Sequence, residues 1–160
     1  ENTPINNVSW HGADEYCNWV GARLPTEAEW ELAARGTHRR LYPWGSEHPY
    51  KTRALFAATF DDILPVDALP EGVSPFQVYG LAGSMWEWVA DEYSDTFYAE
   101  SPAANPANLS AFRVTDRVLR GGGYRSDGSE LRATNRLPGD PIVYQNIPDV
   151  GFRCASSIEE

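Results

Sequence analysis

Helical periodicity is confined to the first 36 residues of this 160-residue chain, and this restricts the fold more than any other feature of the sequence. A first helix is predicted between Ser9 and Gly21, because serine is a favourable N-cap and glycine commonly follows the last turn. The apolar residues of this segment recur at helical spacing and would form one stripe. They are Trp10, Ala13, Tyr16, Cys17 and Val20.

A second helix is predicted between Thr26 and Gly36. Thr26 can cap its first turn, and Glu29, three residues later, completes a capping box, a pattern typical of helix starts. Trp30 and Ala34 are available for packing against the rest of the chain. Two short helices so close in sequence are expected to pack at an angle to each other.

Beyond Gly36 the chain is interrupted by proline and glycine, and it carries only short strand-like segments. The segment MWEWVADEY alternates, with Trp86 and Trp88 on one side and Glu87 and Val89 on the other. The segments RVLRGG, LRATNR and VGFRCAS are predicted to be further short strands. Two helices followed by short strands and long irregular connections indicate the α+β fold class.

Composition excludes some partners and leaves the cysteines undecided. A nucleic-acid-binding face needs clustered basic residues, whereas this chain has a formal net charge of −10 and scattered basic residues. We therefore predict no nucleic-acid partner. No apolar run approaches the roughly 20 residues that span a bilayer, so no membrane span is predicted. Cys17 and Cys154 could be buried thiols or one disulfide, and the sequence by itself favours neither.

The segment GGGYRSDGSELRATNR, residues 121–136, combines a glycine run with spaced arginines. It is not a nucleophile elbow, because Ser126 and Ser129 lack the GxSxG pattern. Its glycines are predicted to permit a turn or a close approach of strands. Arg132 and Arg136 could bind an anionic ligand through their forked guanidinium groups. The alternative is that they form buried ion pairs with acidic residues.

The motifs RLPTEAEWE, YPWG, WEW, RGG and GFR occur in this order along the chain. The combination resembles the formylglycine-generating enzyme (sulfatase-modifying factor) family, over about residues 4–155. It implies a loop-rich C-type-lectin-like fold with two helices and a small antiparallel sheet. Full members begin with additional strands, so residues 1–160 are expected to be a single domain equivalent to the C-terminal two-thirds of the family domain. We expect the sheet edge to be covered by a protein partner or by the remaining part of the same domain.

The resemblance also implies that the family's chemistry has been lost. Catalytic members bind copper through two cysteines after RGG, and these positions match Ser126 and, less closely, Leu131. Neither side chain suits Cu(I), which prefers thiolates, so formylglycine generation is not expected. Members that pass through an oxidising compartment pair the cysteines matching Cys17 and Cys154. The resemblance therefore implies that disulfide and an extracytoplasmic location, periplasmic or secreted.

Calcium is the cofactor that the resemblance implies. The family holds structural Ca²⁺ beside its WEW motif with a glutamate, backbone carbonyls and an upstream asparagine, all of them oxygen ligands. Here Glu87 and the carbonyls of Gly83 and Met85 match this set, whereas the asparagine position is Gly80. The alternative is that Glu87 pairs with an arginine such as Arg120.

The sequence as a whole predicts a non-catalytic domain that binds a ligand or protein, or serves as a subunit of a larger assembly. One alternative is an enzyme with altered chemistry, such as an oxidase-like relative in cofactor or siderophore maturation. Another is a purely structural subunit of the cell envelope. The candidate binding face belongs to residues 121–147, because long loops on a rigid scaffold commonly carry function. Its predicted ligand-binding residues are Tyr124, Arg125, Ser126, Asp127, Arg132, Arg136, Tyr144 and Gln145.

Overall fold

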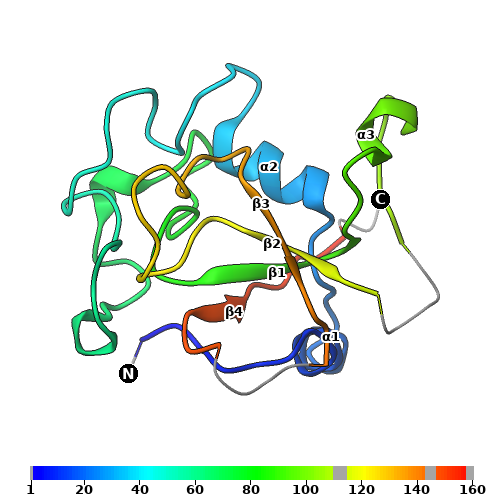
Figure 1. The fold of residues 1–160 in the computed structure, drawn as a ribbon, viewed down its shortest axis with the longest axis horizontal. Coiled ribbons are helices and arrows are strands. Elements are labelled where there is room, and N and C mark those ends of the chain that lie inside the picture. The colour runs from blue at the N-terminus through cyan, green and yellow to red at the C-terminus, as the bar shows by residue number, and fades with distance from the viewer. Residues whose placement is uncertain (1, 110–114, 143–146, 158–160) are drawn as a thin grey trace.

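The chain folds into two helices around a small sheet, with long irregular connections (Figure 1). The computed structural model describes all residues except 1, 110–114, 143–146 and 158–160. The longer helices are α1 (Trp10–Trp19) and α2 (Glu27–Arg35), and the strands are β1 (Trp86–Glu92), β2 (Arg117–Arg120), β3 (Arg136–Gly139) and β4 (Val150–Phe152). Short helical turns are η1 (Phe60–Asp62), η2 (Pro70–Gly72) and α3 (Phe97–Glu100). This confirms the predicted α+β, loop-rich fold.

Both predicted helices are present, with the expected caps. The Ser9 hydroxyl accepts a hydrogen bond from the Gly12 N–H at 3.1 Å. At the start of α2, the Thr26 hydroxyl accepts from the Glu29 N–H at 3.2 Å, and the Glu29 carboxylate accepts from the Thr26 N–H at 2.8 Å. These reciprocal bonds satisfy backbone donors that a helix start leaves unpaired, so the local sequence defines where each helix begins.

The sheet is mixed, with strand order β3-β2-β1-β4. β1 pairs antiparallel with β2, and β2 pairs antiparallel with β3, but β4 runs parallel to β1. The prediction of a purely antiparallel sheet is therefore wrong for β4. Since β3 also runs in the direction of β1, the chain must return across the sheet between the two edge strands before β4 begins. Ile147, in this connection, packs against the core on the α1 side.

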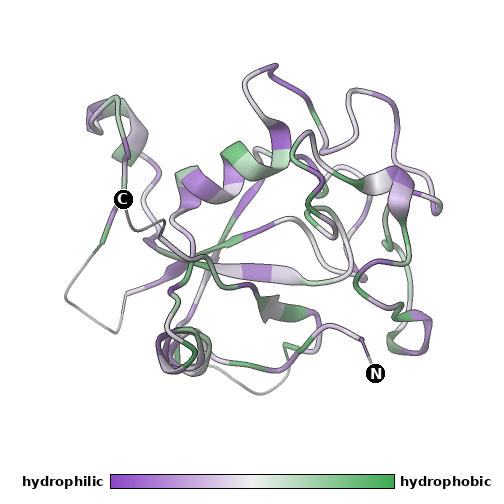
Figure 2. Ribbon diagram, turned by 180° about the vertical axis from the view of Figure 1, so that it is seen from behind, coloured by the Kyte–Doolittle hydropathy of each residue, from purple (hydrophilic) through white to green (hydrophobic). Residues whose placement is uncertain are grey.

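The two helices cover opposite faces of the sheet (Figure 1). The predicted alternation in β1 is confirmed, because Trp86 and Trp88 belong to the cluster with α1, whereas Val89 packs with Trp30 of α2. The exposed side chains of the helices include large apolar ones, Tyr16 and Trp19 of α1 and Leu32 of α2, and Figure 2 shows polar and apolar bands alternating along α2. Each face of β1 therefore meets its own helix, and the central strand is buried on both sides.

The segment LRATNR does not form the predicted strand, because its backbone bonds lie elsewhere. The Ala133 N–H donates to the Leu41 carbonyl at 2.8 Å, and the Asn135 N–H donates to the Arg132 carbonyl at 2.8 Å. Leu131 and Ala133 are buried, but they anchor a turn, and the strand β3 begins only at Arg136. The spacing of these two buried residues, Leu131 and Ala133, is the same as on one face of a strand, although the segment is a turn.

A disulfide joins Cys17 of α1 to Cys154, which follows β4. It confirms the pairing implied by the resemblance and closes a loop with a sequence separation of 137. Nearby, the N–H of Arg23 donates to the carbonyl of Ala155 at 3.0 Å, and the reverse bond measures 2.7 Å. Within the described residues, no helix has the length and apolar character that crossing a bilayer requires.

Candidate functional site

The loop that follows β2 is held in place by backbone hydrogen bonds to two other segments. The N–H groups of Ala57 and Ala58 donate to the carbonyls of Ser126 and Tyr124, at 2.8 and 2.9 Å. The Tyr124 N–H donates to the Ser84 carbonyl at 2.7 Å. These bonds span distant parts of the sequence, so the loop is part of the rigid framework.

The glycine run has the predicted role in this loop. Gly122 has φ +78°, and a β-carbon there would lie 2.7 Å from a methyl carbon of Leu131. Only glycine combines this backbone conformation with so close an approach.

The positions that the resemblance matches to copper-binding cysteines are structural in this chain. Ser126 is buried, and its hydroxyl accepts a hydrogen bond from the Gly123 N–H at 3.1 Å. Leu131 is fully buried in a cluster with Tyr42, Ala54 and Ala82. Both side chains therefore stabilise the loop, and neither offers a ligand that Cu(I) prefers.

The predicted ligand-binding residues divide into exposed and buried ones. Arg125, Asp127 and Arg132 are exposed, so these three remain on the surface as candidate contact residues. Asp127 accepts hydrogen bonds from the Ser129 hydroxyl and N–H, which lower the pKa of its carboxyl group. Tyr124 is buried against Leu55 and Met85, and its burial raises its pKa. Tyr144 and Gln145 lie outside the described residues.

Arg136 forms a buried ion pair, which is the alternative predicted for it. Its guanidinium donates to both oxygens of Glu27, at 2.5 and 2.8 Å, and it lies over the rings of Tyr93 and Tyr98. Glu27 is 1% exposed and also accepts from Arg120 at 3.0 Å. One carboxylate at the start of α2 thus joins two arginines from neighbouring strands.

Asp91 completes this buried polar cluster. Its carboxylate accepts from the N–H of Glu27 at 2.7 Å and from the N–H of Asn108 at 2.8 Å. Burial raises the pKa of Asp91, although these two backbone bonds oppose the shift. A negative charge at a helix N-terminus interacts favourably with the helix dipole, so Asp91 stabilises the start of α2 from the sheet.

Glu87 forms an ion pair with Arg153. The predicted alternative to calcium, an ion pair of Glu87 with an arginine, is therefore present, but the partner is not Arg120. The guanidinium of Arg153 donates to both carboxylate oxygens at 2.6 Å, and the indole N–H of Trp30 donates to one of them at 2.7 Å. Arg153 also donates to the carbonyls of Tyr79 and Gly80, at 3.1 and 3.3 Å. Burial by itself would lower the pKa of Arg153, but the Glu87 carboxylate outweighs it and the pKa is raised.

These residues do not fit the calcium ion that the resemblance implied. The guanidinium of Arg153 already takes both oxygens of Glu87, which would have to be shared between two cations. In the part of the chain that the structure describes, no three acidic, histidine or cysteine side chains gather into a group that could hold a metal ion.

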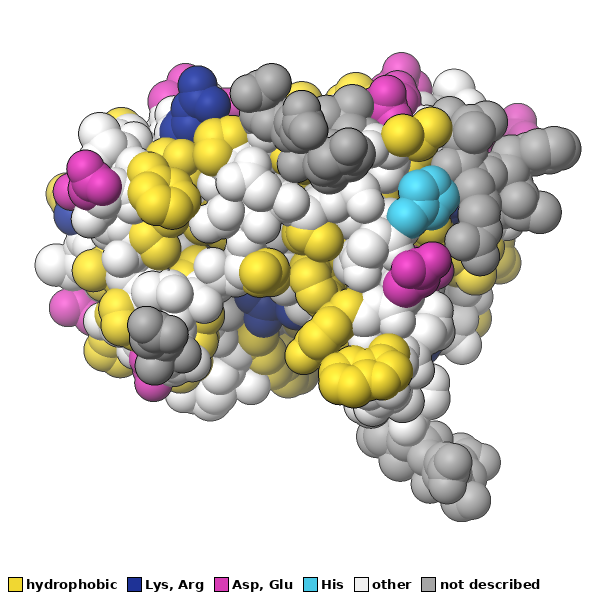
Figure 3. All heavy atoms as spheres, turned by 90° about the horizontal axis from the view of Figure 1, so that it is seen from below, with side chains coloured by type: hydrophobic (Ala, Val, Ile, Leu, Met, Phe, Trp, Pro, Cys, Tyr) yellow, Lys and Arg dark blue, Asp and Glu magenta, His cyan; other side chains and the backbone are white. Residues whose placement is uncertain are grey.

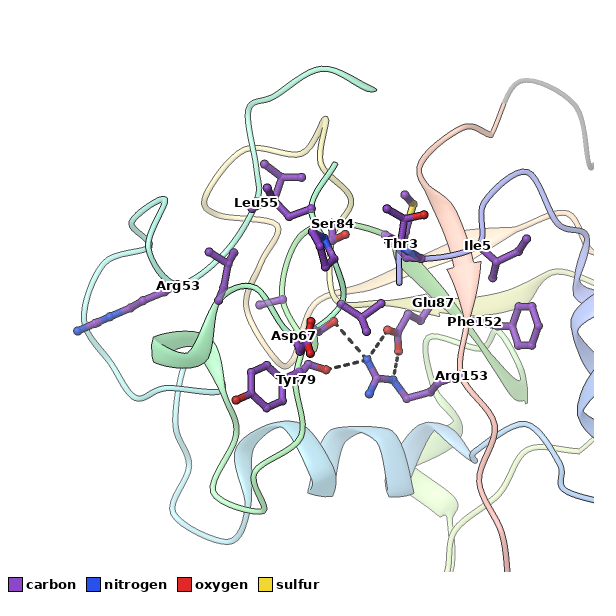
Figure 4. Close-up of a pocket in the computed structure, with 18 residues that line it drawn as sticks. Thr3, Ile5, Arg53, Leu55, Asp67, Tyr79, Ser84, Glu87, Phe152 and Arg153 are labelled. Atoms are coloured by element: carbon purple, nitrogen blue, oxygen red, sulfur yellow. Dashed lines mark hydrogen bonds and ion pairs between the residues drawn. The ribbon is translucent and has the colours of Figure 1, made fainter. Parts of the chain in front are cut away.

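The Glu87–Arg153 pair lies against a cavity of about 470 Å³ (Figure 4). Its lining comes from separate segments, within residues 3–5, 53–55, 64–69, 79–87 and 152–153. No described residue of the segment 121–147 lines it. Sequence reasoning missed this cavity, because no single segment carries a pattern that would reveal it.

The fold and these motifs agree with comparisons to known proteins. Residues 1–158 match the model of the sulfatase-modifying factor enzyme 1-like domain, and the chain belongs to this family. It is 36% identical over 173 residues to the formylglycine-generating enzyme of Streptomyces coelicolor, covering 99% of this chain and 54% of that protein. It is 35% identical over 170 residues to the inactive C-alpha-formylglycine-generating enzyme 2 of Mus musculus, covering 96% and 49%.

Other relatives carry the domain in a different setting. The chain is 38% identical over 157 residues to the serine/threonine-protein kinase pkn1 of Chlamydia caviae, covering 98% of this chain and 24% of the kinase. Among solved structures, PvdO from Pseudomonas aeruginosa superposes with a TM-score of 0.76 at 25% identity, covering 94% of this chain and 60% of that one. The chain thus spans about a quarter of the kinase and about half of the two formylglycine-generating relatives.

Proposed function

We propose that this chain is a non-catalytic binding domain of the formylglycine-generating enzyme family. The observation that carries the proposal is that the cysteines are joined in a disulfide. The sequence has two cysteines, and both are joined in the Cys17–Cys154 disulfide. Copper-dependent oxidation in the family needs two thiolates in the loop after β2, where this chain has Ser126 and Leu131. A chain without a free thiol cannot supply them.

The relatives are consistent with such a role. One of them is named an inactive formylglycine-generating enzyme, and others are protein kinases of which the matching domain is a minor part. We infer that this chain likewise acts within a larger protein or assembly. Loss of the reactive sulfur atoms together with retention of the framework is expected when a fold is kept for recognition.

The exposed side chains of Arg125, Asp127 and Arg132 are the proposed contact residues. They project from a loop that backbone bonds hold in one conformation, so little conformational entropy would be lost on binding. Both signs of charge are present within a few residues, which suits a partner with complementary polar groups. Tyr144 and Gln145, predicted from the sequence for the same face, lie outside the described residues.

The two sheet edges differ in how they could meet a partner. A β-carbon on Gly151 of β4 would lie 2.4 Å from the Ile5 carbonyl oxygen, so the N-terminal segment already lies against that strand. The other edge strand, β3, has four residues and contains Pro138, which removes a hydrogen-bond donor. These features make β3 a poor edge for strand pairing, and we propose that a protein partner, or another part of the same domain, covers it without adding a strand to the sheet.

The disulfide also supports a proposed location. Disulfides persist in oxidising compartments and are rare in the reducing cytosol. We therefore propose an extracytoplasmic location for this domain, periplasmic or secreted.

Two measurements test the absence of chemistry. Purified protein is incubated with Cu(I) and a cysteine-containing sulfatase peptide, with the Streptomyces coelicolor enzyme as the active control. We expect no aldehyde product by mass spectrometry and no stoichiometric copper by metal analysis. Aldehyde formation, or one tightly bound copper ion per chain, would refute the proposal.

A third measurement tests the binding face. Partners cross-linked to the wild-type domain in its native extract should be lost in a triple variant in which Arg125, Asp127 and Arg132 become alanine. A control variant replaces the exposed residues Arg39, Lys51 and Glu71, which lie in other loops, and should retain the partners. Equal cross-linking of all three proteins would contradict the proposed face.

A further inference from the structure

We propose that the cavity beside the Glu87–Arg153 pair binds a small, mostly apolar molecule that bears no negative charge and carries one hydrogen-bonding oxygen, as a phenol does. Its volume of about 470 Å³ lies in the usual range of ligand pockets, about 300–1,000 Å³. Most of its lining is apolar. The apolar residues at its walls include Pro4, Ile5, Leu64, Val66, Met85 and Phe152.

The mouth of the cavity exposes large apolar side chains on one face of the molecule. Figure 3 shows hydrophobic side chains gathered around a hollow on this face. Leu64, Val66 and Ile5 are 38%, 47% and 57% exposed, and all three line the cavity. Covering them with an apolar ligand would remove this surface from water, which is favourable in proportion to its area.

The walls of the cavity are held in place without a ligand. The Val66 N–H donates to the Asn2 carbonyl at 2.9 Å, and the Asn2 side chain donates to Asp67 at 3.3 Å. These bonds fix the N-terminal segment against the loop that faces it. The close contact of Ile5 with Gly151 fixes the same segment against β4. A preformed cavity spares the ligand the cost of ordering its own site.

The charged groups at the cavity disfavour an anionic ligand. At the floor, Arg153 and Glu87 neutralise each other through two bonds of 2.6 Å. Arg53 pairs with Glu47 at 3.5 Å, and in Figure 4 its side chain points away from the other labelled residues. Asp67 also lines the cavity and accepts a hydrogen bond from the uncharged Asn2 side chain, which leaves its negative charge in place. An anionic ligand would lose its hydration without gaining a free counter-charge, which is unfavourable.

The hydroxyl of Ser84 is a polar group of the lining that is available to a ligand. The hydroxyl of Ser84 lines the cavity and makes no side-chain hydrogen bond to another described residue. It can donate to, or accept from, a single ligand oxygen. The surrounding apolar walls would accommodate the remainder of the molecule. This site is separate from the proposed binding face, so its test does not depend on the proposed function.

The chain offers a single-atom reporter for this test, because Met85 is its only methionine and lines the cavity. Protein labelled with ¹³C at the methionine methyl group gives one resonance, which is followed during titration with p-cresol. We expect a saturable shift of this resonance. Benzoate, which matches p-cresol in size but is anionic, should bind at least about tenfold more weakly.

A blocked variant and a matched control complete the experiment. Leu64→Trp places a larger side chain at the mouth and should abolish the saturable shift, and Val66→Trp serves as a second blocked variant should the first fail to fold by circular dichroism. Leu41→Trp is the control, because Leu41 is similarly exposed, at 42%, and does not line the cavity. No saturable shift in the wild type, an undiminished shift in a folded blocked variant, or preference for benzoate would overturn the proposal.

Discussion

Glu27→Gln should destabilise the folded chain far more than a surface substitution does. The Glu27 carboxylate is 1% exposed and receives bonds of 2.5 and 2.8 Å from Arg136 and 3.0 Å from Arg120. The substitution keeps the shape but removes the charge, and it directs an amide N–H₂ group toward two guanidinium groups. Breaking a buried ion pair from one side costs about 3–5 kcal/mol, because the remaining charge stays buried without compensation.

The lower part of this range is expected here, because both arginines keep another partner. Arg120 retains Glu31 and the Ala133 carbonyl, and Arg136 retains the Ser94 carbonyl. A loss of about 3 kcal/mol corresponds to a roughly 150-fold increase in the unfolding equilibrium constant. Urea unfolding at pH 7, followed by tryptophan fluorescence, measures it. The m-value should stay unchanged, because the native contacts are affected and the unfolded chain is not.

Glu31→Gln is the matched control for this prediction. It makes the same chemical change on the same helix and also removes a bond to Arg120, of 2.7 Å, but the Glu31 side chain is 31% exposed. Its loss should be about 1 kcal/mol or less, as for partly exposed ion pairs. If Glu27→Gln costs no more than Glu31→Gln, burial does not determine the strength of this cluster and the reasoning fails.

The disulfide, the response to pH and the response to calcium provide three further tests. Replacing Cys17 and Cys154 by alanine should lower the free energy of unfolding by about 4–5 kcal/mol and raise the urea m-value, because the unfolded chain is released from a loop of sequence separation 137. Glu29→Gln should weaken the loss of stability in acid, because the hydrogen bond from Arg23 lowers the pKa of Glu29 in the folded chain. The Glu29 contribution is complete above its unfolded pKa of about 4.3 and disappears as the pH falls through the lowered folded value, which urea titrations across this window measure. Millimolar CaCl₂ should leave the melting temperature unchanged within about 1 °C in calorimetry, because the oxygens of Glu87 are occupied by a guanidinium.

Each of these tests has an outcome that contradicts it. An unchanged m-value in the double cysteine variant would place the loss in native packing instead of in the unfolded chain. An acid transition of Glu29→Gln as steep as that of the wild type would show that the carboxylate does not titrate as its contacts indicate. A melting temperature that rises with calcium would show that Arg153 gives up its place to the metal ion.

The helices could be predicted from the sequence because their determinants are local. Ser9, Thr26 and Glu29 make their hydrogen bonds within three residues of themselves, so a short window of sequence contains both partners. The alternation in β1 could be predicted for a similar reason, since Trp86 and Trp88 alternate with Glu87 and Val89 along the strand. Local chemistry therefore accounts for where these elements begin and how they face the core.

The ion pairs and the cavity could not be predicted, because their partners are far apart in the chain. Glu27 and Arg136 are separated by 109 residues, and Glu87 and Arg153 by 66. The sequence indicated that its acidic residues and arginines could pair, but many pairings satisfied the same composition. The residues themselves allowed either two buried thiols or one disulfide, and only the family resemblance implied the disulfide. The direction of β4 likewise depends on a connection that carries no strand signal.

The covalent link between Cys17 and Cys154 also determines how this domain would respond to mechanical force. Tension applied along the backbone would enter through the short segment before Cys17 and leave through the segment after Cys154. The disulfide would transmit the force directly from Cys17 to Cys154. The chain between the two cysteines, which contains all four strands and α2, would therefore bear no tension. Within a larger protein under strain, the domain would lengthen only at its two short flanks until a reductant opened the loop.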